Sequence, residues 1–63
     1  MSAFSALLTA EDLAARWQVS RGSLANERSA GRGAPFVKLS SRVRYRLADI
    51  EAFELAALVV AVA

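Results

Sequence analysis

The sequence contains no cysteine and no histidine, which argues against several classes of function. Without cysteine there is no disulfide framework and no thiolate metal site. Without histidine, the commonest zinc ligand and the side chain best suited to proton transfer near neutral pH are missing. We therefore expect no metal or other cofactor, and we expect a cytoplasmic chain rather than a disulfide-stabilised secreted one.

The chain is also short, and it has few large apolar side chains. Its 63 residues allow one domain, spanning 1–63. A domain of this size buries only about 60% of the surface that its unfolded chain exposes. Of its hydrophobic residues, 14 are alanine, which buries little area. No nucleophile has a base nearby in sequence and there is little room for a pocket, so we expect that the protein is not an enzyme.

Long hydrophobic runs are absent as well. Residues 1–8 carry no basic side chain and are not expected to form a signal peptide. The run Leu55–Ala63 is wholly apolar, but as a helix it would span only roughly 14 Å, less than half of a bilayer core. We therefore expect no membrane-spanning segment and no membrane partner.

Charge of one sign is concentrated in the middle of the chain. Glu27 is the only acid between positions 16 and 46, so this segment has eight cations and one carboxylate, a net charge of +7. A surface that is merely solvated usually mixes both signs, and clustering of one sign favours a polyanionic partner. The eight basic residues are Arg16, Arg21, Arg28, Arg32, Lys38, Arg42, Arg44 and Arg46.

Two helices joined by a short turn are predicted in the first half of the chain. Thr9 is the expected N-cap of a helix that runs to about Trp17. Ser20 is the expected N-cap of a second helix, which extends to Ala30 and ends at Gly31 in the left-handed conformation. In DNA-binding proteins with this helix-turn-helix spacing, the second helix lies in the major groove.

Residues 37–46 alternate between apolar and charged side chains, which is typical of a β-hairpin. A three-residue loop, 40–42, would place Lys38 and Arg44 on the exposed side of the hairpin. The same register gives a buried face with four apolar side chains, Val37, Leu39, Val43 and Tyr45.

A third helix is predicted to begin at Ala48 and to bury Ile50 and Phe53 along one face. Residues 55–63 are expected to continue it as an apolar extension, which either covers the core or drives self-association. Together the elements predict a mainly α-helical domain with a small β-hairpin.

The second helix carries the first set of residues expected to contact DNA. Its face opposite Leu24 has small or amide side chains that can approach base edges, and asparagine suits a bidentate contact with adenine. Arg21 stands at the unfavourable end of the helix dipole, where a phosphate or a guanine edge would compensate for its charge. The alternative interpretation is that these small polar residues simply cover a solvent-exposed helix and bind no DNA. This recognition set is Ser20, Arg21, Gly22, Ser23, Ala25, Asn26 and Ser29.

The hairpin and its surroundings carry the second set, which would lie along the phosphate backbone or in a minor groove. Exposed strand edges are often charged to prevent aggregation, but four cations without an acid exceed that need. Arg28 is expected either to pair with Glu27 or with the acids of the first helix, or to contact a phosphate. This backbone set is Arg28, Arg32, Lys38, Ser40, Ser41, Arg42, Arg44 and Arg46.

Several blocks of the sequence, in order, resemble the excisionase-type winged helix-turn-helix domains, which are related in fold to the DNA-binding domain of MerR-like regulators. The likeness covers about residues 7–54 and rests on 7–14, 19–21, Gly31, Pro35, 37–39, 42–46 and 49–53. The residues depart from the family at Glu27, where members often have an aromatic, and at Ser40 and Ser41, where a glycine is common.

The resemblance implies a winged helix-turn-helix fold with Ser20–Ala30 as the recognition helix and Val37–Arg46 as the wing. It implies cooperative self-association on double-stranded DNA at repeated attachment sites, and bending of that DNA. It further implies a recombination directionality factor, encoded by a phage or mobile element in a bacterial host, that assists a tyrosine or serine integrase in excision.

Two other functions stay open at this stage. A MerR-like transcriptional regulator would use the same fold at a promoter. A protein-interaction module would instead bind an acidic partner through the basic hairpin and assemble through the apolar end. The salt dependence of DNA binding separates that module from the DNA-binding alternatives.

Overall fold

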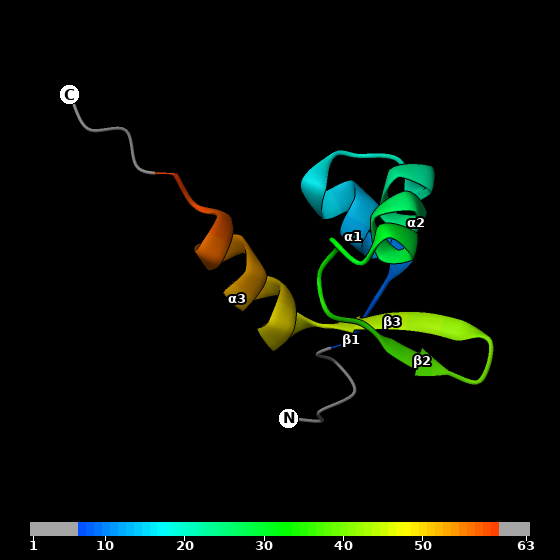
Figure 1. Cartoon of the computed structure of the whole chain (residues 1–63). Coiled ribbons are helices and arrows are strands. Elements are labelled where there is room, and N and C mark those ends of the chain that lie inside the picture. Colours follow the sequence, from blue (N-terminus) through cyan, green and yellow to red (C-terminus); the bar gives the residue numbers. More distant parts are fainter. Residues whose placement is uncertain (1–6, 60–63) are drawn as a thin grey trace.

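The computed structural model describes residues 7–59 as three helices and a three-stranded antiparallel sheet. Figure 1 shows α1 and α2 together on one side of the sheet, the β2–β3 hairpin projecting beyond them, and α3 leaving in the opposite direction. The fold is thus mixed α/β, with more sheet than the sequence predicts. The elements are β1 (Leu7–Thr9), α1 (Ala10–Trp17), α2 (Arg21–Ala30), β2 (Val37–Leu39), β3 (Arg42–Arg46) and α3 (Leu47–Ala57).

The first two helices begin and end where their capping residues predict. The hydroxyl of Thr9 accepts a hydrogen bond from the backbone N–H of Asp12, and the Asp12 carboxylate accepts one from the N–H of Thr9, each at 3.0 Å. This reciprocal pair is a capping box. The Ser20 hydroxyl accepts from the N–H of Ser23 at 3.0 Å, and α2 ends at Gly31, whose φ of 74° is left-handed. The predicted pair of helices joined by a short turn is confirmed.

A short strand that the sequence analysis does not predict adds a third member to the sheet. β1 pairs with β3 in antiparallel register, with Leu8 opposite Tyr45 and Thr9 opposite Arg44. The strand order is β1-β3-β2, so β3 is central. A run of three residues is too short for a periodic pattern, which explains why these residues read only as the approach to α1.

The register of the β2–β3 hairpin differs from the prediction. Val37 lies opposite Arg44 and Leu39 lies opposite Arg42, so two residues, Ser40 and Ser41, form the turn. The expected three-residue loop is therefore wrong. Ser40 has a φ of 57°, the positive value that the first position of a favoured two-residue hairpin turn requires.

This register also overturns the predicted buried face. Side chains alternate between the two faces of a strand, so Val43 and Tyr45 point to the helices while Val37 and Leu39 point away from them. Leu39 is 48% exposed. The apolar pattern misleads here because β2 is a three-residue edge strand, so the turn and not burial sets the register.

The core lies between the helices and the central strand. Leu13 of α1, Tyr45 of β3 and Ile50 of α3 are at most 1% exposed, and Leu24 of α2 is 5% exposed. Full burial of an aliphatic side chain of this size contributes about 1.5–3 kcal/mol. Each helix and the central strand thus supplies one large side chain, and all of these elements depend on the others.

The third helix ends earlier than the sequence predicts. It stops at Ala57, and Leu58 is extended, so the predicted helical extension over residues 55–63 is wrong beyond Ala57. Residues 60–63 of that prediction lie outside the described part of the chain. Leu55, Leu58 and Val59 are 72%, 63% and 88% exposed. Among residues 7–59, no helix has the length and apolar character needed to cross a membrane.

Candidate nucleic-acid interface

One edge of α2 carries two arginines. Arg21 and Arg28 are seven residues apart, which is about two turns, so both lie on the same side of the helix. They line a shallow groove together with Val43 and Arg44 of the central strand. The groove therefore joins one edge of α2 to β3, two elements that are separate in sequence.

The start of α1 forms the remaining wall of this groove, through Thr9, Ala10 and Glu11. An oxygen of Glu11 lies 3.7 Å from a guanidinium nitrogen of Arg21, and both side chains are largely exposed. An exposed pair at this distance contributes little to stability. Sequence reasoning did not assign these residues to the interface, because helix capping and the helix dipole already account for them.

Asp12 follows Glu11 in the first turn of α1. Its pKa is lowered, mainly by the hydrogen bonds from the backbone and side chain of Thr9, and to a smaller extent by the positive charge of Arg44. The central strand therefore brings a guanidinium close to the first turn of α1.

Arg28 connects α2 to the sheet. Its Nη1 donates a hydrogen bond of 2.8 Å to the hydroxyl of Tyr45, and its guanidinium carbon is 5.9 Å from the centroid of the Phe36 ring. The expected pairing of Arg28 with Glu27 or with the acids of α1 is wrong, because no ion pair of Arg28 with them is found in residues 7–59. Contact between Arg28 and a phosphate stays a prediction.

The hairpin cations are divided between the two faces of the sheet. Lys38 lies opposite Val43 on the face toward the helices, whereas Arg44 belongs to the other face. The expectation that Lys38 and Arg44 share one exposed face is therefore wrong, because it followed from the three-residue loop. The Nη1 of Arg44 donates to the carbonyl of Val43 at 2.8 Å, so this half-buried guanidinium folds back on its own strand.

Arg46 is held by the first turn of α3. Its Nε and Nη2 donate to the two carboxylate oxygens of Asp49 at 2.6 and 3.2 Å. This hydrogen-bonded pair raises the pKa of Arg46. Of the predicted contact residues on the hairpin, Arg46 is thus the one already occupied by a carboxylate.

Half of the basic residues have acidic partners. The pairs are Arg16 with Glu54, Arg21 with Glu11, Arg32 with Glu27 and Arg46 with Asp49. Within the described ranges, no ion pair within 4.0 Å involves the other four cations, Arg28, Lys38, Arg42 and Arg44. Three of these four cations are on the β2–β3 hairpin, and Arg28 is on α2.

The solvent face of α2 lies next to this cationic edge. Its small and amide side chains are exposed except for Ala25, which is half-buried. The Ser20 hydroxyl, which caps the helix, also donates to the Ser23 hydroxyl at 3.0 Å. The exposed members of the predicted recognition set are Ser20, Arg21, Gly22, Ser23, Asn26 and Ser29.

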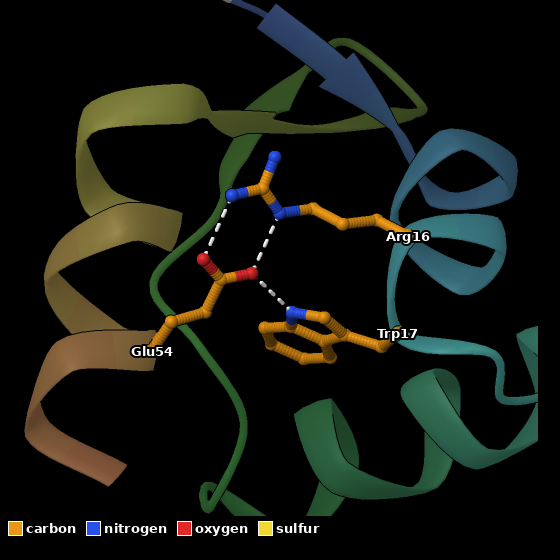
Figure 2. A network of polar contacts seen from close by, with 3 residues as sticks. All are labelled: Arg16, Trp17 and Glu54. Atoms are coloured by element: carbon orange, nitrogen blue, oxygen red, sulfur yellow. Dashed lines mark hydrogen bonds and ion pairs between the residues drawn. The ribbon is translucent and has the colours of Figure 1, made fainter. Parts of the chain in front are cut away.

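A polar network outside the groove attaches α3 to the end of α1 (Figure 2). The Glu54 carboxylate accepts hydrogen bonds from Nε and Nη2 of Arg16 at 2.6 and 2.8 Å, and from Nε1 of Trp17 at 2.6 Å. These bonds, first from Arg16 and then from Trp17, lower the pKa of Glu54 to about 2. The Trp17 ring stacks on Phe53 with centroids 5.6 Å apart. Sequence reasoning missed the network because its members are 37 and 38 residues apart.

Comparison of the chain with protein-family models, with curated protein sequences and with solved structures gives no match. Function must therefore be inferred from the residues of the groove and of α2.

Proposed function

We propose that the protein binds double-stranded DNA as a winged helix-turn-helix domain. In this proposal α2 is the recognition helix in the major groove, and the β2–β3 hairpin is a wing on the phosphate backbone or in a minor groove. The observation that carries the proposal is the groove lined by Arg21 and Arg28 of α2 and by Arg44 of β3.

The charge balance of the groove favours an anionic ligand. Arg28 is half-buried and Arg44 is half-buried, and neither forms an ion pair with a carboxylate in residues 7–59. Arg21 has only the distant Glu11, and its position in the first helical turn opposes the helix dipole. Charge-assisted hydrogen bonds to phosphate oxygens would supply the missing negative partners.

The adjacent face of α2 favours a duplex over other polyanions. An α-helix with its side chains is about 10–12 Å across, which fits the major groove of about 12 Å. Gly22 and Ser29 have little side chain to hold the helix away from base edges, and Asn26 is exposed beside them. Phosphate contacts would fix the position of the helix, while Asn26 would read a base.

We further propose that binding serves excision by an integrase, as the sequence resemblance to excisionase-type domains suggests. A wing on the backbone or in a minor groove would bend the duplex, and subunits on neighbouring attachment-site repeats would form an architectural complex. A MerR-like regulator would use the same residues on the duplex, and a gel-mobility assay on permuted fragments measures the bend on which the excision proposal depends.

A salt titration tests DNA binding itself. A site is first selected from a pool of random duplexes, and the affinity for a fluorescent copy is then measured by anisotropy as salt is raised. The logarithm of the affinity is expected to fall linearly with the logarithm of salt concentration, with a slope of about −0.9 per phosphate contact. No selected site, or an affinity independent of salt, would contradict the proposal.

A further inference from the structure

A second hollow in the molecule is separate from the cationic groove. It is a cavity of about 90 Å³ beneath α2, and it shares no lining residue with the groove. Its walls are mainly apolar and aromatic, with Leu13 and Trp17 from α1, Leu24 from α2, Tyr45 from β3 and Phe53 from α3.

The edge of this cavity carries no net charge. Glu27 and Arg32, which also line it, form a pair at 3.4 Å. The cavity therefore lacks the net positive charge that would attract a polyanion to the groove. The rest of the lining is mainly apolar and aromatic, and the two charged groups are paired with each other, so the chemistry favours an apolar occupant. An engineered cavity of about 150 Å³ holds benzene, and the smaller one here has room for an aliphatic side chain.

The chain itself exposes an apolar segment of matching chemistry. Leu55, Leu58 and Val59 are 72%, 63% and 88% exposed, and no residue from 55 to 63 is charged or polar. Leu58 lies beyond the end of α3 in an extended conformation, so its backbone is outside the helix. The uncharged segment thus complements a cavity with a neutralised edge, and burial would remove its side chains from water.

The geometry of α3 places this segment away from the cavity of its own molecule. Phe53 lines the cavity, and the helix continues from it to Ala57, which carries Leu58 about 7 Å further along the helix axis. In Figure 1 the red segment of chain that follows α3 runs away from α1 and α2. A segment from a second copy of the chain could reach the cavity without any change in α3 or in the cavity itself.

We propose that the apolar segment Leu55–Val59 of one molecule docks over the cavity beneath α2 of a second copy and inserts one aliphatic side chain into it. The two surfaces are different, so the contact is heterologous. The copy that donates its segment keeps a free cavity, and the copy that provides the cavity keeps a free segment. The contact does not involve the cationic groove, and it forms without DNA.

Two variants of the full chain separate the two sides of the contact. In the first, Leu58→Asp with Val59→Asp, the segment becomes charged while only exposed side chains change. In the second, Glu27→Leu, a branched apolar side chain replaces a carboxylate side chain on the cavity wall and takes up part of the cavity. If Glu27→Leu does not fold, Ala34→Val fills the cavity from another wall.

Sedimentation equilibrium measures the outcome. The wild-type mass should rise above that of a monomer with concentration, and each variant alone should stay monomeric. A mixture should form a 1:1 complex, because one variant retains the cavity and the other retains the segment. The emission of Trp17, the single tryptophan, should move to shorter wavelength on mixing, since it lines the occupied cavity.

Other outcomes would overturn the proposal. They are a wild-type protein that stays monomeric throughout its soluble range, a cavity-filled variant that associates as the wild type does, and variants that do not combine. A Trp17 spectrum that responds to the segment substitutions equally at all concentrations would assign the cavity to the segment of the same molecule instead.

Discussion

Arg28 of α2 donates a hydrogen bond of 2.8 Å to the hydroxyl of Tyr45 on β3. This contact fixes the helix to the central strand beside the groove that both elements line. Tyr45 is 1% exposed, so its ring is locked in the core and its hydroxyl offers a rigid anchor for the guanidinium. The position of the cationic edge of α2 therefore depends on a core residue.

Tyr45→Phe should remove this anchor without emptying the core. We expect a loss of about 1 kcal/mol in the free energy of unfolding, because a net hydrogen bond contributes about 0.5–1.5 kcal/mol. DNA affinity should fall as well, since Arg28 would no longer be held in place. Urea denaturation and anisotropy measure the two effects. Unchanged stability and affinity would show that the bond has no such role.

The network of Glu54, Arg16 and Trp17 predicts a specific response to acid. The pKa of Glu54 is about 2 in the folded chain, against an ordinary value of 4.5. A carboxyl group whose pKa is lowered by folding stabilises the fold fully above its unfolded pKa. That contribution is lost as the pH falls from 4.5 to about 2.

Glu54→Gln should accordingly be less stable than the wild type near neutral pH, and the difference between the two should shrink as the pH falls through this window. Thermal unfolding at a series of pH values measures the difference. Glu11→Gln, an exposed change on α1 outside the network, is the control. A difference between Glu54→Gln and wild type that does not vary with pH would contradict the assignment.

In the two-residue turn, Ser40 and Ser41 have different backbone conformations, so replacing each by glycine should affect stability differently. Ser40 has a φ of 57°. The left-handed conformation costs a residue other than glycine about 1–2 kcal/mol, which the greater chain entropy lost by glycine on folding partly offsets. Ser40→Gly is therefore expected to raise the free energy of unfolding by up to about 1 kcal/mol. Ser41→Gly, at a position without a positive φ, should not raise it; equal gains would argue for a different turn.

Local signals in the sequence were sufficient to predict the first two helices. Thr9 and Ser20 each satisfy N–H groups within three residues, and Gly31 ends α2 because it accepts a positive φ. Each of these features depends on a few neighbouring residues, so a sequence pattern carries it. The same holds for the charge cluster, which needs no structure to be recognised.

Contacts that depend on distant partners could not be predicted in this way. The register of β2 was wrong because Leu39 is on an edge strand where burial imposes no face. β1 has three residues and is recognisable only from its pairing with β3. The sequence predicts only part of the candidate groove, namely Arg21, Arg28 and Arg44 as contact residues. Glu11 belongs to the groove because of the way α1 packs, which no local pattern shows.

Asn26→Ala tests the proposed base-reading face of α2. Asn26 is exposed and alanine favours helices more than asparagine does, so the fold should not be weakened. Discrimination between the selected site and a site with its adenine replaced should fall by about 1–3 kcal/mol. Competition binding with the two duplexes measures it, with Ala52→Ser on α3 as control. Full discrimination by Asn26→Ala would exclude Asn26 as the reader.

The most direct test of the central claim is the salt slope of DNA affinity for Arg44→Gln compared with Arg16→Gln. Both changes remove one positive charge, but only Arg44 lines the groove shared with Arg21 and Arg28. For folded proteins, the slope should become shallower by about one unit for Arg44→Gln and stay close to wild type for Arg16→Gln. Equal slopes for the two variants would contradict the claim that the groove between α2 and β3 binds the phosphate backbone.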